Sequence, residues 1–275
     1  MMNTKNMNMD YEGVEIPDYF GEDGLLHCGA CHEAKEAYFP GGIEWNGKRT
    51  HPRMCLCRRT ENERMQKRAK QLEHEQEVSR LRARCFTDKY MNNWTFENDN
   101  GLNSKMEKIK EYVSDWETKE KENCGLLLWG GVGTGKSYMA GCIANALLEQ
   151  EVSVQMTNFA AILNDLNSHY SDRNEYIQSL CRNRLLIIDD LGMERGTDYG
   201  LEQVYNVIDA RYRSHKPLII TTNLTLNEMS NETNVARKRI YDRVLAMCTP
   251  IQIQGTHMRK IERENKFKKF TEGKK

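Results

Sequence analysis

Residues 130–137 read Gly130-Gly131-Val132-Gly133-Thr134-Gly135-Lys136-Ser137, which is the pattern G-x-x-x-x-G-K-S. The apolar run Leu126–Trp129 precedes this stretch, and an amphipathic stretch from Tyr138 to Leu148 follows it. A strand, a glycine-rich loop and a helix in this order bind phosphate, because backbone N–H groups at the helix N-terminus turn toward the anion. Lys136 then reaches the β- and γ-phosphates, and the Ser137 hydroxyl ligates Mg²⁺. The stretch therefore predicts a nucleotide site formed by residues 130–138.

The sequence around this loop alternates between strand-like and helix-like segments. This alternation predicts an α/β fold with a parallel sheet and crossover helices. The expected strands are residues 126–129, 152–157, 184–190 and 217–222, with a short fifth at 251–253. The expected helices are residues 138–148, 159–168, 201–212 and 235–247.

Polar side chains follow two of the apolar runs. Asp189 and Asp190 come directly after Leu185–Ile188, and Asn223 follows the run that begins at Leu218. The carboxyl ends of parallel strands face the ligand crevice, so Asp189 suits Mg²⁺ coordination and Asp190 suits orienting or deprotonating the attacking water. Asn223 can hydrogen-bond a γ-phosphate or that water. The alternative for each is a polar residue that only ends a strand.

A cluster of arginines lies in the segment 237–243, which reads R-K-R-I-Y-D-R. A guanidinium offered to the γ-phosphate of a neighbouring subunit neutralises charge on the transferring group. The alternative for any one of these arginines is a solvated helix face.

Taken together, these motifs resemble the AAA+ ATPases of the DnaC/DnaI helicase-loader and IstB transposition-helper group. The resemblance rests on the glycine-rich loop and on L-L-I-I-D-D-L-G, T-T-N and R-I-Y-D-R, in that order, and covers residues 86–258. The segment Asn93-Trp94-Thr95-Phe96-Glu97 also resembles the start of their catalytic domain. The resemblance implies a P-loop NTPase domain with a central parallel β-sheet flanked by helices.

The resemblance also implies residue roles. Lys136 and Ser137 become the Walker A pair, Asp189 and Asp190 the Walker B acids, and Asn223 sensor 1. Arg243 becomes the expected arginine finger, with Arg239 as the other candidate. Arg259 is the candidate for a second-sensor arginine.

Proteins of this group bind ATP and single-stranded DNA and place a replicative helicase on the template. The resemblance therefore implies ATP hydrolysis in a homo-oligomer whose partners are a hexameric DNA helicase and single-stranded DNA. An IstB-like helper of DNA transposition, an adaptor that binds ATP without hydrolysis and a small-molecule kinase are the alternatives. Asp190 stands where many relatives have Glu, and its shorter side chain reaches less far toward water. Glu194 is a candidate to compensate.

Four cysteines near the N-terminus occur in two close pairs, Cys28-x-x-Cys31 and Cys55-x-Cys57. Each short spacing lets two sulfurs converge on one ion, which suits tetrahedral Zn²⁺. Unrelated free thiols and a redox C-x-x-C are the alternatives. A zinc module before the ATPase domain resembles the DnaI side of the group, where it contacts the helicase. Three histidines are possible substitute ligands: His27, His32 and His51.

Composition divides the chain into four parts. We expect a zinc-binding, partner-binding module at 1–57, a charged helical linker at 58–85, the ATPase domain at 86–258 and a basic tail at 259–275. The linker lacks Gly and Pro and would span about 40 Å as a helix. A coiled coil that binds a partner is its alternative. The tail has eight Lys and Arg against three Glu, a composition that can contact a phosphate backbone.

Bulk composition sets further limits. Lys plus Arg and Asp plus Glu both number 40, so global charge gives no argument for or against nucleic acid. No apolar run approaches the roughly 20 residues that a membrane span needs. The N-terminus lacks the apolar core of a signal peptide. Clustered cysteines in an ATPase indicate metal binding in reducing cytosol. We therefore expect a cytoplasmic protein that does not enter a membrane.

Overall fold

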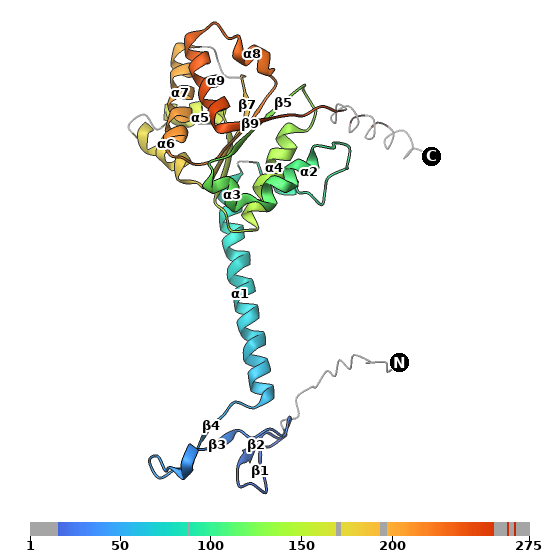
Figure 1. Ribbon diagram of the computed structural model, residues 1–275, viewed down its shortest axis with the longest axis vertical. Coiled ribbons are helices and arrows are strands. Elements are labelled where there is room, and N and C mark those ends of the chain that lie inside the picture. The colour runs from blue at the N-terminus through green and yellow to red at the C-terminus, as the bar shows by residue number, and fades with distance from the viewer. Residues whose placement is uncertain are drawn as a thin grey trace. The chain divides into compact units, whose positions relative to one another are not determined.

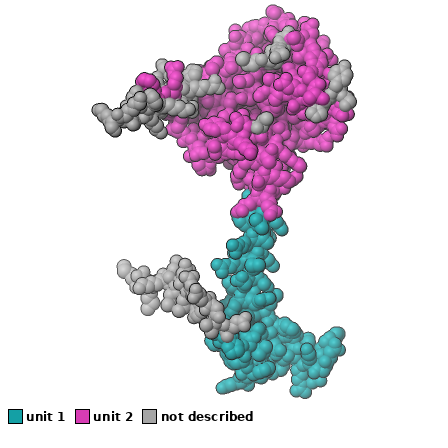
Figure 2. Space-filling model, turned by 180° about the vertical axis from the view of Figure 1, so that it is seen from behind, with its two compact units in different colours: residues 1–74 teal, residues 75–275 magenta. Residues whose placement is uncertain are grey.

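The computed structural model describes residues 16–86, 88–168, 172–192 and 197–255, together with Arg263 and Phe267. The chain divides into two compact units, residues 1–74 and 75–275 (Figure 2). Within the described ranges, no helix combines the length and apolar character required to cross a membrane. Glu194, Arg259 and most of the tail 259–275 lie outside the described residues. The four-part domain division expected from composition remains a prediction.

The first unit contains two small antiparallel hairpins. In the first, β1 (Tyr19–Phe20) pairs with β2 (Leu26–His27). In the second, β3 (Glu36–Tyr38) pairs with β4 (Thr50–Pro52), and the short 3-10 helix η1 (Pro40–Gly42) lies in the connection. These strands are too short to bury a core of their own, so another element must hold them together.

A long helix, α1 (Leu56–Cys85), follows β4. Its sequence has good helix formers and no Gly or Pro, and the helical conformation expected for residues 58–85 is confirmed. Its buried residues, Val78, Leu81 and Cys85, all lie in its last turns. The earlier turns are therefore stabilised by helix propensity and local charge pairs rather than by packing.

The second unit is built on one five-stranded parallel sheet (Figure 1). Its strand order is β6 (Val154–Asn158), β7 (Leu185–Leu191), β8 (Leu218–Thr222), β5 (Gly125–Trp129) and β9 (Cys248–Gln252). All neighbouring strands run parallel, so the α/β fold predicted from the alternating segments is confirmed. The last strand begins before the expected 251–253 and includes Pro250, which an edge strand tolerates because one side of it needs no ladder hydrogen bond.

Two helical layers cover the sheet because successive residues of each strand face opposite sides. In β5, Leu126 and Leu128 pack in one cluster, and Leu127 packs in the other. One face carries α2 (Met106–Ser114), α3 (Trp116–Lys121) and α4 (Lys136–Leu148) (Figure 1). The other face carries α5 (Phe159–Ser168), α6 (Arg173–Arg182), α7 (Asp198–Arg213), α8 (Leu226–Ser230) and α9 (Val235–Met247). The five strands therefore end together at one edge of a sheet that is buried on both faces.

Candidate nucleotide-binding site

The glycine-rich loop connects β5 to α4, as its sequence predicts. Gly130 has φ 147°, and a Cβ there would lie 2.2 Å from the backbone oxygen of Ile253, so only glycine fits. Gly135 has φ 96° and is the N-cap residue of α4. This left-handed residue turns the chain sharply into the helix, so the loop's N–H groups surround the helix N-terminus, where a phosphate is favoured.

Lys136 is buried and hydrogen-bonded in this loop. Its Nζ donates to the backbone oxygens of Gly130 and Gly131 at 2.9 and 2.8 Å, and to Oδ1 of Asn223 at 2.8 Å. The structure thus brings together two residues that the sequence predicts for phosphate contact. Their meeting point is the carboxyl end of β8, beside the loop that follows β5.

The two acids lie at the end of β7, the neighbouring strand. Asp189 accepts a hydrogen bond from the hydroxyl of Thr221 and another from Ser137. Burial raises the pKa of Asp189, while these two hydrogen bonds act in the opposite direction by favouring the carboxylate. Asp190 is exposed, has φ 59° and lines the cavity beside the loop. The adjacent hydroxyl and carboxylate oxygens of Ser137 and Asp189 form a donor set that suits Mg²⁺.

A cavity of about 790 Å³ opens between the loop and the segment that precedes α2. This volume falls in the range of cofactor pockets. Lys136, Asp190 and Asn223 line one part of it, and the aromatic side chains of Tyr90 and Trp94 line another. The lining thus combines charged and polar groups with aromatic rings, which are the groups that bind the phosphates and the base of a nucleotide.

The aromatic wall is held by one face of α4. Tyr138 donates its hydroxyl to the backbone oxygen of Thr95 at 2.8 Å, and Nδ2 of Asn145 donates to the backbone oxygen of Trp94 at 3.0 Å. Between them, Gly141 leaves room for the indole, since a Cβ there would lie 2.4 Å from Cε3 of Trp94. The helix that starts at the phosphate loop therefore also fixes the opposite wall.

The two candidate finger arginines lie on α9, and neither lines the cavity of its own chain. Arg243 is held internally: its Nε donates to Asp209 at 2.7 Å, and its guanidinium lies 4.6 Å from the ring centroid of Tyr205. Arg239 is exposed and forms no ion pair within the described residues. A phosphate contact by either arginine would therefore require a second copy of the chain.

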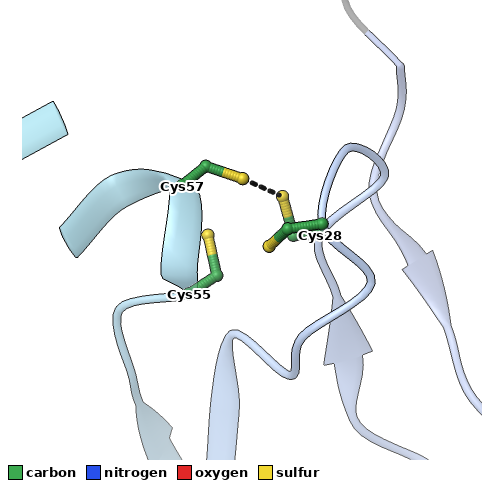
Figure 3. A group of neighbouring side chains, drawn as sticks. Cys28, Cys55 and Cys57 are labelled. Atoms are coloured by element: carbon green, nitrogen blue, oxygen red, sulfur yellow. Dashed lines mark hydrogen bonds between the residues drawn. The ribbon is translucent and has the colours of Figure 1, made fainter. Parts of the chain in front are cut away.

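The four N-terminal cysteines converge, as their spacing predicts. The sulfurs of Cys28, Cys31, Cys55 and Cys57 all lie within 4.8 Å of one another. Figure 3 shows Cys28 facing Cys57 at a sulfur–sulfur distance of 3.7 Å, with Cys55 beside them. Zinc–sulfur bonds of about 2.3 Å in a tetrahedron require sulfur–sulfur edges of about 3.8 Å. The cluster therefore has the size of a Cys₄ zinc site.

The electrostatics of this cluster also fit a cation. Backbone N–H groups of Cys57 and Glu33 lower the pKa of Cys31 to about 6, and those of Cys31 and Ala30 lower the pKa of Cys28. Hydrogen bonding to Cys31 raises the pKa of Cys57 to about 12. Thiolate is the form that binds metal, so the backbone already stabilises part of the ligand set. The three candidate histidines lie outside the group of converging sulfurs.

Several residues that shape the site escape prediction from the sequence. Thr221, Gly141 and Asn145 belong to no phosphate-binding motif, and their contacts lie with residues distant in the chain. The one available signal was the pair of threonines before Asn223, which is polar for the end of a central strand. That pattern alone does not show which hydroxyl faces the acids.

Comparison with known proteins agrees with this geometry. The family model described as IstB-like ATP binding protein matches residues 54–266. The phage-like element PBSX protein XkdC of Bacillus subtilis is 31% identical over 147 residues, which are 51% of this chain and 54% of XkdC. The replicative helicase loader DnaI of the same organism is 25% identical over 147 residues, which are 49% of this chain and 47% of DnaI.

The chain thus spans about half the length of the curated relatives it matches. Among solved structures, a crystal structure of DnaI matches with a TM-score of 0.52 at 21% identity, covering 63% of this chain and 95% of that chain. At this level of identity the likeness shows a shared fold.

Proposed function

The chain belongs to the family of IstB-like ATP-binding proteins, and from this membership we propose that it is an ATPase that loads a replicative DNA helicase and binds single-stranded DNA. The observation that carries the proposal is the cavity lined by the glycine-rich loop, Asp190 and Asn223, with Asp189 hydrogen-bonded to Ser137 beside it. The similarity to DnaI and the four-cysteine cluster support the loader role over other AAA+ roles.

ATP would occupy the cavity with its phosphates on the loop and its base against the aromatic wall. Lys136 would exchange its bonds to the loop carbonyls for bonds to the β- and γ-phosphates. Ser137 and Asp189 would hold Mg²⁺, which supplies positive charge to the phosphates. Asp190 would orient the attacking water, and Asn223 would hydrogen-bond the γ-phosphate beside Lys136.

Subunits would complete one another's sites in a homo-oligomer. Both candidate fingers lie outside the chain's own cavity, as a finger that acts on a neighbour must. Arg239 is exposed, whereas Arg243 would have to leave Asp209 and Tyr205 to reach a phosphate. The geometry therefore favours Arg239, although the resemblance to the group points first to Arg243.

The N-terminal unit would bind one Zn²⁺ through its four cysteines and contact the helicase. The ion would join the first hairpin, which carries Cys28, to the start of α1, which carries Cys57. Such a crosslink suits a unit whose strands are too short to form a core. Exposed aromatic side chains, among them Phe20 and Trp45, give this unit surface for a protein partner.

Affinity capture of the full chain tests the loader role. In the presence of ATP, we expect a hexameric DNA helicase to co-purify, and we expect Cys28→Ser to weaken that capture without weakening ATP binding. Recovery of a transposase in place of a helicase would establish the second candidate, an IstB-like helper of transposition, a role suggested by the name of the matched family. Binding assays with single-stranded and duplex DNA separate the same two functions.

Hydrolysis needs its own test because Asp190 is shorter than the usual Glu. Steady-state phosphate release should fall at least about 100-fold in Lys136→Ala and in Asp190→Asn. ATP binding should be lost in the first variant and kept in the second, since Lys136 lies in the phosphate loop whereas Asp190 would act on the attacking water. Phosphate release equal to that of wild type in both variants would indicate a non-hydrolysing adaptor.

A further inference from the structure

Thr221 connects the two acids without facing the cavity. It lies in β8, at the centre of the sheet, and its side chain is fully buried. Its hydroxyl donates to Oδ1 of Asp189 and accepts a hydrogen bond of 2.9 Å from the backbone N–H of Asp190. A single buried oxygen thus binds the side chain of one acid and the backbone of the next.

The strand pairing changes at the same place. β7 and β8 pair in register up to Ile188 and Ile220, and pairing resumes at Leu191 and Thr222. β7 therefore carries one more residue than β8 across this interval, which is a β-bulge. The bulge contains the two acids, and its second acid, Asp190, has φ 59°, a conformation that is uncommon for a residue other than glycine.

The Thr221 hydroxyl supplies the partners that this bulge would otherwise lack. The N–H of Asp190 has turned out of the regular ladder, and it donates to the threonine instead of to a backbone oxygen. On the far side of the bulge, the Thr222 hydroxyl donates to the backbone oxygen of Leu191 at 2.7 Å, where the strands rejoin. Side-chain hydroxyls therefore replace ladder hydrogen bonds across the bulge.

We propose that Thr221 is a positioning residue for ATP hydrolysis, one that holds Asp189 toward Ser137 and holds Asp190 in the conformation that faces the cavity. This inference rests on the proposed function. Thr221 is not among the residues that line the cavity, so it acts through the two acids. The bulge moves the backbone of Asp190 out of the line of the strand. This displacement compensates for a side chain that is one methylene shorter than that of Glu.

Two substitutions separate the effect of the Thr221 hydroxyl from the effect of the side chain's shape. Thr221→Val keeps the shape of the side chain and removes both hydrogen bonds, whereas Thr221→Ser keeps the hydroxyl. Loss of a group that orients a metal ligand typically costs 10–100-fold, so in Thr221→Val we expect kcat to fall about 10–100-fold and the Mg²⁺ midpoint for ATP binding to rise about tenfold. ATP affinity in EDTA should stay within about twofold, since Thr221 does not contact the loop, and Thr221→Ser should restore kcat to within about threefold of wild type.

Thr222→Val is the matched control. Thr222 is equally buried in the same strand, but its hydroxyl bonds to the backbone of Leu191 and Leu224 rather than to the acids. A general weakening of β8 would give the two valine variants the same loss of kcat and the same change in Mg²⁺ midpoint. That result would overturn the proposal, as would an unchanged Thr221→Val or a Thr221→Ser that fails to recover.

The Mg²⁺ titration separates this inference from the proposed function. It is read from the fluorescence of a labelled ATP analogue on the full chain and needs no turnover. Absence of phosphate release in wild type would contradict the proposed ATPase, while an altered Mg²⁺ midpoint in Thr221→Val would still support the positioning of Asp189. An unaltered midpoint in an active enzyme would contradict the inference alone.

Discussion

Single residues of α4, the helix that follows the phosphate loop, hold the aromatic wall of the cavity in place. Gly141 is the clearest case, because a Cβ there would overlap the indole of Trp94. We predict that Gly141→Ala displaces Trp94, destabilises the fold by about 1–3 kcal/mol and weakens ATP binding about tenfold. Thermal unfolding and titration with a fluorescent ATP analogue measure the two effects.

The double variant Gly141→Ala with Trp94→Leu serves as the control for this prediction. The smaller side chain makes room for the new methyl group, so stability should largely return while ATP affinity stays low. Stability losses that simply add in the double variant would mean that the alanine and the indole do not interact.

The residues of the site differ in how far the sequence could predict them. Lys136, Ser137 and the loop glycines sit in one continuous motif whose chemistry is local, and Asp189 and Asn223 follow from the rule that parallel strands end at one edge. Thr221 depends on the register between β7 and β8, which no single strand encodes. Its role therefore emerges only when the two strands are paired.

At the scale of secondary-structure elements, one buried arginine of α7 donates hydrogen bonds to the ends of three other elements. Arg211, near the end of α7, is fully buried and donates to backbone oxygens of Cys181 and Asn183 at the end of α6, of Arg184 before β7 and of Pro217 before β8. Burial lowers the pKa of its guanidinium to about 10, so the side chain stays charged at neutral pH. The carbonyl groups of Cys181 and Pro217 also accept hydrogen bonds from Lys216 and from the N–H of Leu186. Arg211 therefore matters most to the carbonyl groups of Asn183 and Arg184.

We predict that Arg211→Met destabilises the protein by about 3 kcal/mol, because the carbonyl groups of Asn183 and Arg184 lose this donor at once. Arg213→Met is the matched control, since Arg213 lies two residues on in the same helix, its side chain is 75% exposed, and Asp209, with which it pairs, keeps the less exposed Arg243 as a partner. That variant should change stability by no more than about 0.5 kcal/mol. Urea unfolding of both variants provides the measurement, and equal losses would contradict the role given to Arg211.

The elements themselves were predictable where apolar periodicity was strong. All five strands of the sheet and the helices α4, α5, α7 and α9 follow from it, whereas α2, α3, α6 and α8 are not among the expected helices. Of these, α6 shows the physical reason. Its sequence, Arg173–Arg182, carries more charged and amide side chains than apolar ones and buries only Ile177, Leu180 and Cys181. Such a helix is stabilised by the surface it covers, which the sequence of the segment does not contain.

At the scale of the whole molecule, we expect the two units to bind different ligands. We predict one zinc ion per chain, bound by the four converging cysteines, and loss of that ion in Cys55→Ser. Zinc release on chelation, measured with a chromogenic dye, gives the stoichiometry. ATP affinity of the zinc-free protein should stay within about twofold of wild type, because the nucleotide cavity lies wholly in the second unit. A stoichiometry of zero, or an unaltered zinc content in the serine variant, would exclude a Cys₄ site.

We expect the assembly to need two subunits for each active site, because both candidate finger arginines lie outside the cavity of their own chain. A Lys136→Ala subunit has an inactive phosphate loop but keeps Arg239 as its arginine finger. An Arg239→Ala subunit keeps an active phosphate loop but lacks the finger. Each variant alone should be inactive, while an equimolar mixture should recover about a quarter of wild-type phosphate release, the share of head-to-tail interfaces that pair a good site with a good finger.

The same mixture made with Arg243→Ala distinguishes a finger from a structural arginine. Removing Arg243 also deprives the buried Asp209 of a partner, so this variant should lose thermal stability, and a second subunit cannot restore that loss. Recovery with Arg243→Ala and none with Arg239→Ala would reverse the assignment, because it would show that Arg243 leaves Asp209 when subunits meet. No recovery of phosphate release in either mixture would mean that the positive charge needed for catalysis comes from the same subunit that binds ATP. An active site shared between subunits would then have no support.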